Sequence, residues 1–267
     1  MHPHNSFVTL TFSDKTLLDP DLPFTGSVNL RDVQLFMKRL RKAYSDKTIR
    51  FFACGEYSPQ HKRPHYHLLL FNQHFEDQKL FQDKNSKQLF TSKILSILWP
   101  YGFSTIGIVN YQTARYCAQY TLKKITGDLA PEHYTWPHPA TGEFIRAEPE
   151  FVTMSTKPGI GSSWYDKYKS DCYPADFLIV DGKKHPVPKY YDLKLKKEAY
   201  GPHKNNVDPL DKLKRSRKRA AVKDRENHTP ERLAVREELL KEKLKRSSRS
   251  GELQCFQDSI PSTTPKP

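Results

Sequence analysis

Hydrophobic and polar positions alternate in two different rhythms along the first 200 residues. Short runs rich in β-branched and aromatic residues predict strands, and apolar residues recurring every three or four positions predict helices. The expected strands cover 6–12, 49–57, 64–72, 103–109, 151–154 and 177–180. The expected helices cover 30–44, 86–99 and 112–126. This order of strands and helices suits a sheet with helices packed against it.

The strands over 49–57 and 64–72 are close enough in sequence to form a hairpin. Their connector, residues 58–63, joins a Ser-Pro turn to the charged run His61-Lys62-Arg63. A basic hairpin tip is well placed to hold a phosphodiester backbone. A second hairpin is expected farther along the chain, where Asp181-Gly182 is a strong two-residue turn.

Two histidines one residue apart begin the apolar run of the strand over 64–72. Residues i and i+2 of a strand point to the same face, so His65 and His67 are expected side by side. Glu56 lies near the end of the preceding strand and returns to this face if the two strands pair. Two imidazoles and one carboxylate suit Mg²⁺ or Mn²⁺ acting on a phosphate oxygen. The alternative is a solvent-exposed polar pair, because the motif is short and His2-Pro3-His4 has the same spacing.

The helix expected over 112–126 follows a capping residue, Asn110, and carries three polar side chains on one face. Tyr116 and Tyr120 are four residues apart and Lys123 follows three residues later. Beside a bound metal the tyrosines are candidate nucleophiles, and the lysine is a candidate partner for a phenolate or a phosphate. The alternative is packing of half-buried tyrosines, in a chain that has 14 of them.

Composition adds a partner to this picture. The 267-residue chain has a formal net charge of +14, which points to a polyanion, nucleic acid before membrane. Its four cysteines are scattered without a Cys-x-x-Cys pair, which argues against a zinc ribbon or a disulfide framework and fits a reducing compartment. No signal peptide or membrane-length apolar run is visible, so we expect the protein to act in a cytoplasm, without a membrane partner.

The composition changes near residue 201. Residues 201–267 hold 17 Lys and Arg against 10 Asp and Glu, and this net +7 is half of the excess of the whole chain. A dense basic run covers 212–223, and a short amphipathic helix is expected over 233–244. We therefore expect a domain over residues 1–200 and a basic, partly disordered tail over residues 201–267. The tail either adds non-specific DNA affinity or keeps the chain soluble.

The candidate residues can be combined into one reaction. A metal held by His65 and His67 would polarise a phosphodiester, and a tyrosine attacking in line would displace the 3′ oxygen. The products would be a 5′-phosphotyrosine link and a free 3′-hydroxyl, and a second tyrosine would permit a second transfer at the same metal. Because an in-line approach needs an unstacked backbone, the substrate must be single-stranded or extruded at the cut.

In their order and spacing these segments resemble the three motifs of HUH endonucleases, the initiators of rolling-circle replication. The motifs are Phe7-Val8-Thr9-Leu10-Thr11, Pro64-His65-Tyr66-His67 and Tyr116-x-x-x-Tyr120-x-x-Lys123. The run Gly55-Glu56-Tyr57 ahead of the second motif makes the chain similar to the initiators of microviruses, in the gokushovirus branch that infects bacteria such as chlamydiae. The similarity covers roughly residues 5–200. Members of this group often carry a Cys-rich segment before the first motif, whereas this chain begins almost at that motif.

The resemblance implies an α+β fold in which helices pack on a central antiparallel sheet, of ferredoxin-like or RRM-like type. It implies Glu56 as the third metal ligand, and Tyr116, ahead of Tyr120, as the nucleophile of the first cut. The implied function is nicking of viral origin DNA in the cytoplasm of an infected bacterium, followed by strand transfer that circularises the displaced strand. No small-molecule cofactor is implied. Because no Walker A sequence is present, unwinding is expected from a host helicase, and synthesis from a host DNA polymerase.

Two other functions are weighed against this one. A non-catalytic single-stranded nucleic-acid-binding protein of RRM type would use sheet aromatics and charge, and chelators or His65→Ala would leave its binding unchanged. The lack of an RNP1-like Lys-Gly-Phe-Gly-Phe run disfavours this function. A transposase or relaxase would share the chemistry in a different biology, and the two-tyrosine helix favours a replication initiator.

Overall fold

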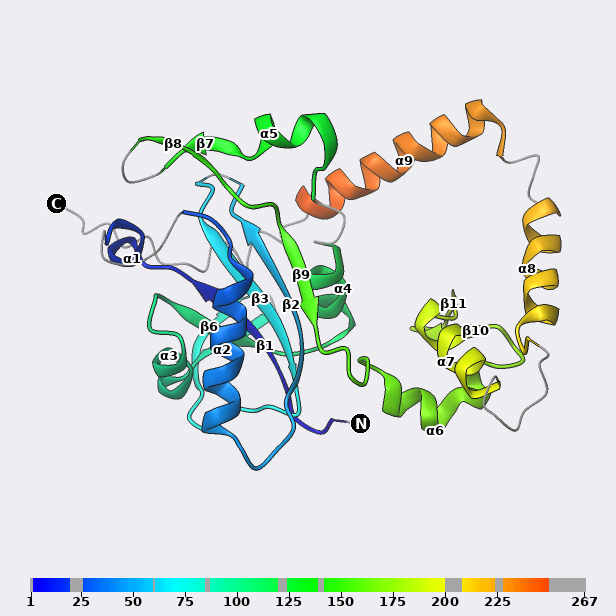
Figure 1. Ribbon diagram of the computed structural model, residues 1–267, viewed down its shortest axis with the longest axis horizontal. Coiled ribbons are helices and arrows are strands. Elements are labelled where there is room, and N and C mark those ends of the chain that lie inside the picture. Colours follow the sequence, from blue (N-terminus) through cyan, green and yellow to red (C-terminus); the bar gives the residue numbers. More distant parts are fainter. Residues whose placement is uncertain are drawn as a thin grey trace. The chain divides into compact units, whose positions relative to one another are not determined.

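A computed structural model describes residues 2–19, 26–59, 61–84, 87–119, 124–138, 142–199, 208–223 and 228–249. Contacts divide these residues into two compact units, which Figure 1 shows as a blue-to-green part and a green-to-orange part. The first unit covers residues 2–160 and the second begins at residue 161. The domain boundary expected at residue 200 falls inside the second unit.

The first unit is built on a seven-stranded sheet in the order β4-β5-β6-β1-β3-β2-β9, and all neighbouring strands are antiparallel. These strands are β1 (Asn5–Thr11), β2 (Arg50–Tyr57), β3 (Pro64–Phe71), β4 (Lys79–Lys84), β5 (Lys87–Thr91), β6 (Ser104–Gly107) and β9 (Phe151–Met154). A separate hairpin pairs β7 (Thr135–Pro137) with β8 (Phe144–Arg146). The helical segments are α1 (Asp14–Leu18), α2 (Leu30–Ala43), α3 (Lys93–Leu98), α4 (Tyr111–Gln119), η2 (Gly127–Leu129) and α5 (Ala130–His133). This architecture confirms the expected α+β fold with a central antiparallel sheet.

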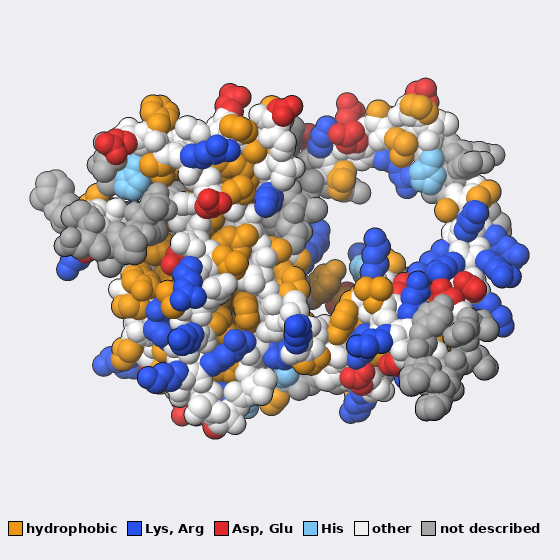
Figure 2. Space-filling model, in the orientation of Figure 1, with side chains coloured by type: hydrophobic (Ala, Val, Ile, Leu, Met, Phe, Trp, Pro, Cys, Tyr) orange, Lys and Arg blue, Asp and Glu red, His pale blue; other side chains and the backbone are white. Residues whose placement is uncertain are grey.

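Helix α2 packs across one face of the sheet (Figure 1). The Asn29 side chain accepts a hydrogen bond from the Arg31 amide and caps the helix, as expected. The apolar positions recur at helical spacing and are all buried against the sheet: Val33, Phe36, Met37 and Leu40. Lys and Arg side chains lie along the solvent side of this helix (Figure 2). Burial of this stripe holds α2 on the sheet.

The central hairpin sets the two faces of the sheet apart. In the pairing of β2 with β3, Glu56 lies directly opposite His65 and Cys54 lies opposite His67. Between the two histidines, Tyr66 points to the other face, where its hydroxyl donates to Asp32 of α2 at 2.7 Å. The histidines therefore lie on the face that α2 does not cover.

The single helix expected over 86–99 is wrong. Residues 87–91 form strand β5, and α3 begins only at Lys93, after Ser92 caps it by accepting from the Leu95 amide. Leu89 and Leu95 are both buried, as the helical pattern required, but they belong to two different elements. A short apolar run fits either period, and the cap at Ser92 together with pairing to β4 decides between them.

The second unit begins with α6 (Ser162–Cys172) and the hairpin of β10 (Phe177–Val180) with β11 (Lys183–Pro186). The expected turn is confirmed, because Asp181 and Gly182 both have positive φ. Three helices follow: α7 (Lys189–Ala199), α8 (Asp211–Lys223) and α9 (Pro230–Arg249). The last of these contains the helix expected over 233–244. No described helix combines the length and the apolar character that a membrane crossing requires.

A small aromatic cluster holds α6 and α7 together. Tyr165 is fully buried, and the Trp164 ring stacks on Tyr191 with centroids 5.6 Å apart and planes 12° apart. Neither α6 nor α7 is predicted from the sequence, because their apolar positions are mostly tyrosines that do not form a regular hydrophobic stripe. Packing inside this unit accounts for the aromatic residues near 164–168.

Candidate functional site

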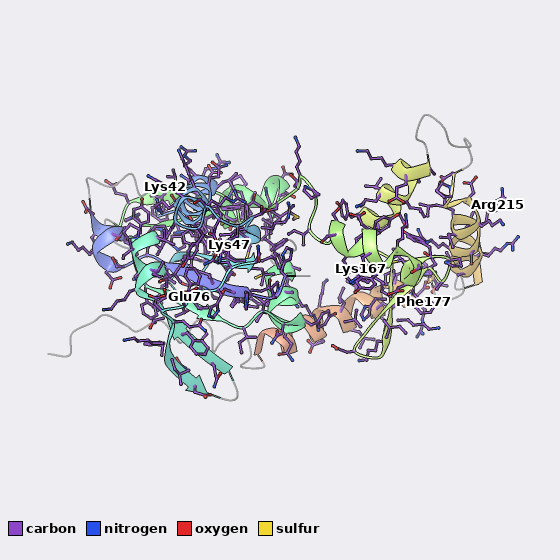
Figure 3. The ribbon with its side chains drawn as sticks, turned by 90° about the horizontal axis from the view of Figure 1, so that it is seen from below. Lys42, Lys47, Glu76, Lys167, Phe177 and Arg215 are labelled. Carbon is purple, nitrogen blue, oxygen red and sulfur yellow. The ribbon has the colours of Figure 1, made fainter. Side chains whose placement is uncertain are left out.

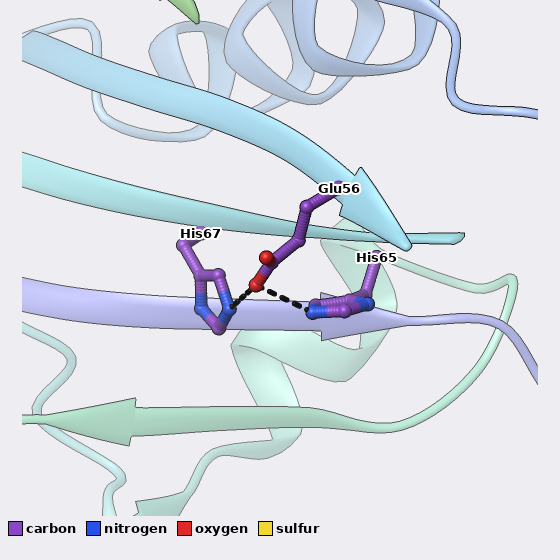
Figure 4. Close-up of side chains that lie close together, drawn as sticks. All are labelled: Glu56, His65 and His67. Atoms are coloured by element: carbon purple, nitrogen blue, oxygen red, sulfur yellow. Dashed lines mark hydrogen bonds and ion pairs between the residues drawn. The ribbon is translucent and has the colours of Figure 1, made fainter. Parts of the chain in front are cut away.

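Three buried side chains converge on the face of the sheet away from α2 (Figure 4). One carboxylate oxygen, Glu56 Oε1, lies 2.8 Å from His65 Nε2 and 2.9 Å from His67 Nε2. The exposed fraction of each residue is 3 % or less. Three metal-ligating atoms, one from each residue, all lie within 4.8 Å of one another. The predicted ligand set is therefore assembled in one place.

Strand pairing explains this convergence. The histidines share a face because they are two residues apart on β3, and Glu56 reaches that face because it pairs directly with His65 across the hairpin. On the other side of β3, strand β1 places Thr9 opposite His67. The central strand thus presents both imidazoles between two neighbours that are fixed by ladder hydrogen bonds.

The outer nitrogen of each imidazole is held by a neighbouring polar atom. His65 Nδ1 lies 3.2 Å from the Arg63 carbonyl oxygen, and His67 Nδ1 lies 3.0 Å from Thr9 Oγ1. A carbonyl oxygen can only accept, so His65 carries its proton on Nδ1 and presents the Nε2 lone pair to Glu56. The ring of Phe7 stacks on His67, with planes 9° apart and centroids 5.5 Å apart. Both rings are thereby oriented with Nε2 toward the carboxylate.

The electrostatics of the triad favour a bound cation. Burial alone would raise the pKa of Glu56, but the neighbouring His65 and His67 outweigh it and hold the pKa well below its usual range. An ionised carboxylate then faces a nitrogen lone pair at 2.8 Å, an arrangement that a shared cation stabilises. Spacings near 3 Å match the edge of an octahedron whose metal–ligand bonds are about 2.1 Å long. The donor set therefore fits a divalent cation.

Helix α4 brings Tyr116 to the triad. The helix is capped by Asn110, whose side-chain oxygen accepts from the Thr113 amide at 2.8 Å while Thr113 Oγ1 accepts from the Asn110 amide at 2.9 Å. The Tyr116 hydroxyl lies 3.4 Å from both Glu56 Oε1 and His67 Nε2. Its ring meets the His67 ring edge-on, with centroids 5.1 Å apart. Of the expected tyrosine pair, this phenol is therefore at the candidate metal site.

The remaining part of the expected tyrosine motif is not described. Helix α4 is described over Tyr111–Gln119, which confirms the first part of the helix expected over 112–126. Tyr120 and Lys123 lie outside the described residues. Their roles rest on their spacing from Tyr116 in the sequence.

The same face holds a buried thiol that is not a suitable metal ligand. Cys54 lies two residues before Glu56 on β2, and its Sγ is 3.9 Å from the His67 carbonyl oxygen. Burial, with the neighbouring Cys117 thiol, raises the pKa of Cys54 well above its usual range. Cys54 is therefore a neutral packing residue, since metals bind the thiolate form.

The supports of the histidines, Thr9, Phe7 and the Arg63 carbonyl, are not among the residues that the sequence predicts for the site. The sequence marks Thr9 and Phe7 only as part of a strand-like motif. Their roles depend on the antiparallel register of β1 with β3, which brings positions about 58 residues apart into contact. The polar threonine within an otherwise apolar strand was the one local signal.

Comparisons with known proteins agree with this geometry. Residues 5–125 match the family model of the replication-associated protein ORF2, a range that contains the triad and Tyr116. Through these residues the chain belongs to the replication-associated protein family. The chain is 34 % identical over 203 residues to the replication-associated protein ORF2 of Spiroplasma virus 4, covering 73 % of this chain and 59 % of that protein. The expected similarity to microvirus proteins is confirmed.

Two further replication-associated proteins are more distant relatives. The chain is 28 % identical to replication-associated protein VP4 of Bdellovibrio phage phiMH2K, over 74 % of this chain and 59 % of that protein. It is 22 % identical to replication-associated protein ORF4 of Chlamydia phage 1, over 73 % of this chain and 47 % of that protein. The chain thus spans about half to three fifths of the length of these relatives. No solved structure matches the chain.

Proposed function

We propose that this chain is a metal-dependent nickase and strand transferase that initiates rolling-circle replication of phage DNA. The observation that carries the proposal is the distance of 3.4 Å from the Tyr116 hydroxyl to Glu56 Oε1 and His67 Nε2. A phenol beside a two-histidine, one-carboxylate cation site is the minimum that tyrosine attack on a phosphodiester requires. Membership of the replication-associated protein family supports this function.

Glu56, His65 and His67 would hold the cation, which we take to be Mg²⁺ or Mn²⁺. When bound, the cation polarises the scissile phosphodiester by accepting a non-bridging oxygen. The protein's own part is to fix the ligands beforehand: Thr9 and the Arg63 carbonyl hold the imidazoles, and the buried carboxylate is already ionised. Such preorganisation lowers the cost of ordering the site when substrate binds.

Tyr116 would be the nucleophile of the first transfer. Attack forms a bond between its phenol oxygen and phosphorus and breaks the bond from phosphorus to the 3′ oxygen. The proton that the phenol loses is matched by the proton that the 3′ oxygen gains, which leaves a 5′-phosphotyrosine and a free 3′-hydroxyl. A hydroxyl at 3.4 Å from two ligand atoms leaves no space for a phosphate between them. Substrate entry therefore requires the Tyr116 side chain to move away from the triad.

Tyr120 and Lys123 complete the proposal from the sequence. Tyr120 would attack the regenerated junction, so that the strand held by Tyr116 is released and circularised. Lys123 would neutralise charge on the phosphate or on the phenolate. Four- and three-residue spacings on a continued helix would place both on the face that carries Tyr116.

The partners follow from the same chemistry. The substrate would be single-stranded or extruded origin DNA, because stacked duplex does not allow in-line attack. Unwinding and synthesis would come from a helicase and a DNA polymerase of the infected bacterium. Since the relatives belong to bacterial phages, the site of action would be the host cytoplasm.

An RRM-type binding protein is the weaker candidate. Such a protein stacks bases on aromatic rings exposed on the central strands. Here Phe7 on β1 is 1 % exposed, because its ring packs on His67 and edge-on against Tyr116. On the face that α2 covers, Tyr66 is fully buried. Neither ring is available for stacking on a base.

Chelation distinguishes the two functions. Labelled single-stranded DNA would be incubated with the protein and Mn²⁺, with and without EDTA, and the fragments resolved on a denaturing gel. We expect cleavage with Mn²⁺, none with EDTA, and a loss of at least about 100-fold in rate for Glu56→Gln. The matched control is Glu148→Gln, a carboxylate outside the triad, which should cleave normally. Binding without cleavage under all these conditions would favour the RRM-type function.

A further inference from the structure

Helix α8 of the second unit is docked through one arginine. Arg217 Nε donates to Asp176 Oδ2 at 2.7 Å, and its Nη1 donates to Asp192 Oδ2 of α7 at 2.8 Å. Its Nη2 also pairs with Asp176. Asp192 is held in turn by the Tyr173 hydroxyl, which donates to its Oδ1 at 2.6 Å. Two carboxylates on one guanidinium fix which side of α8 faces the rest of the unit.

The opposite side of α8 is uniformly basic. We define the outer basic face of α8 as four exposed residues: Lys212, Arg215, Lys218 and Arg219. At 100° per residue they occupy an arc of about 120° whose centre lies roughly opposite Arg217. None of the four forms an ion pair with another described residue. Figure 2 shows blue side chains gathered over this helix, and Figure 3 labels Arg215 among them.

This face is not explained by folding. The lysine that does stabilise the helix, Lys214, lies outside the face and pairs with Asp208 and, at 3.8 Å, with Asp211. Asp211 is the acidic residue of α8, so the face beyond its first turn has no opposing charge on the helix. Four like charges within three turns repel one another, and a polyanion placed against them removes that repulsion.

We propose that the outer basic face of α8 is a binding site for the phosphate backbone of duplex DNA. The helix has 13 residues, about 20 Å in length, enough to lie along several consecutive phosphates. Single-stranded DNA is the less suitable partner, because strand binders add aromatic rings for base stacking and α8 has none. The inference rests on the proposed function only in taking DNA as the polyanion. It gives the second unit the task of holding duplex flanking the single-stranded cleavage site.

Salt dependence of duplex binding tests this site. Anisotropy of a fluorescent duplex of about 20 base pairs and arbitrary sequence would be titrated with the full chain at several NaCl concentrations. The variant combines Lys212→Ala, Arg215→Ala and Arg219→Ala. Each lost phosphate contact should reduce the slope of log K against log salt by about 0.9, so the slope should fall by about two to three. Affinity near 0.1 M salt should fall by at least about tenfold.

Two further variants control for charge and for folding. The combination of Lys167→Ala, Lys183→Ala and Lys189→Ala removes three exposed charges from the same unit but not from α8, and should bind nearly as the unaltered chain does. The pair Arg215→Lys and Arg219→Lys keeps the charge and should retain binding, since backbone contact needs no fork geometry. Circular dichroism would verify that all variants keep their helices.

Several outcomes would overturn the inference. One is an equal loss of affinity in the α8 variant and the charge-matched control. Another is a loss confined to single-stranded DNA, or to anionic lipid vesicles, with duplex binding intact. The proposed function is tested separately by Mn²⁺-dependent cleavage of a single-stranded oligonucleotide, which the α8 variant should carry out normally. If the unaltered chain binds duplex through α8 but never cleaves, the proposed function fails and the α8 site stands.

Discussion

At the scale of single residues, each imidazole of the site is set by the atom behind it. Thr9 Oγ1 fixes the ring of His67, and the Arg63 carbonyl oxygen fixes the ring of His65. Neither support is a ligand, yet both determine which nitrogen faces Glu56. The ligands themselves could be predicted from the two-residue period of a strand, whereas the supports could not, because they depend on tertiary register.

Thr9→Val should weaken metal binding while leaving the fold intact. Valine has nearly the shape of threonine but cannot hydrogen-bond His67 Nδ1, so the ring loses its fixed orientation. We expect Mn²⁺ affinity, measured by isothermal titration calorimetry, to fall by about 10-fold to 100-fold. Thr105→Val is the matched control, since Thr105 lies opposite Thr9 on β6 and makes no hydrogen bond to His67. Equal affinity in both variants would show that Thr9 does not position the ligand.

At the scale of elements, capped helices on opposite faces serve different purposes. Helix α2 packs on the core, whereas α4 carries Tyr116 to the triad. The sequence predicts both helices, because each begins with a capping asparagine and is followed by apolar residues at helical spacing. It failed over 86–99, where a short apolar run satisfied two periods and the deciding pairing of β5 with β4 and β6 is tertiary.

Removing either cap should cost similar stability but different activity. Asn110→Ala and Asn29→Ala should each lower the free energy of unfolding by about 1 kcal/mol, measured by urea denaturation. Only Asn110→Ala should also slow DNA cleavage, because fraying of α4 displaces Tyr116 from the triad. Equal cleavage rates in the two variants, under conditions where both are folded, would separate α4 from the chemistry.

Helix α3 should make part of the stability depend on pH. Burial opposes ionisation of Asp77, but hydrogen bonds from Ser92 and from the Ile94 amide outweigh it and lower the pKa of Asp77. The stabilisation is therefore present above the unfolded pKa, near 4, and is lost as pH falls through the lower folded value. The difference in unfolding free energy between the unaltered chain and Asp77→Asn should shrink from about pH 6 to about pH 3. A constant difference would contradict this assignment.

At the scale of the whole molecule, chemistry and the basic helix α8 belong to different compact units. The triad and Tyr116 lie in residues 2–160, and α8 lies in the unit that begins at residue 161. Composition alone could not predict this division. It marked a change near residue 201, whereas the aromatic cluster of Tyr165 and Tyr191 joins 161–199 to the later helices instead.

Metal should therefore protect one unit and not the other. Hydrogen exchange with and without saturating Mn²⁺ would report on both units within the full chain. At about 100 times the dissociation constant, binding should add about 2.7 kcal/mol to the slowest-exchanging amides of β1, β2 and β3. Amides of α6 and α7 should be unchanged, and Glu56→Gln should abolish the effect. Protection spread evenly over both units would contradict separate cooperative behaviour.

The central claim is that a phenol on α4 attacks DNA at the cation site of β2 and β3. Its most direct test is covalent capture: the protein, Mn²⁺ and a 3′-labelled pool of single-stranded DNA, with the labelled band resolved under denaturing conditions and its peptide mapped by mass spectrometry. The account predicts a phosphotyrosine adduct at Tyr116 or Tyr120, absent with EDTA and absent when both are replaced by Phe. An adduct that survives the double replacement, or no adduct from any sequence in the pool, would contradict it.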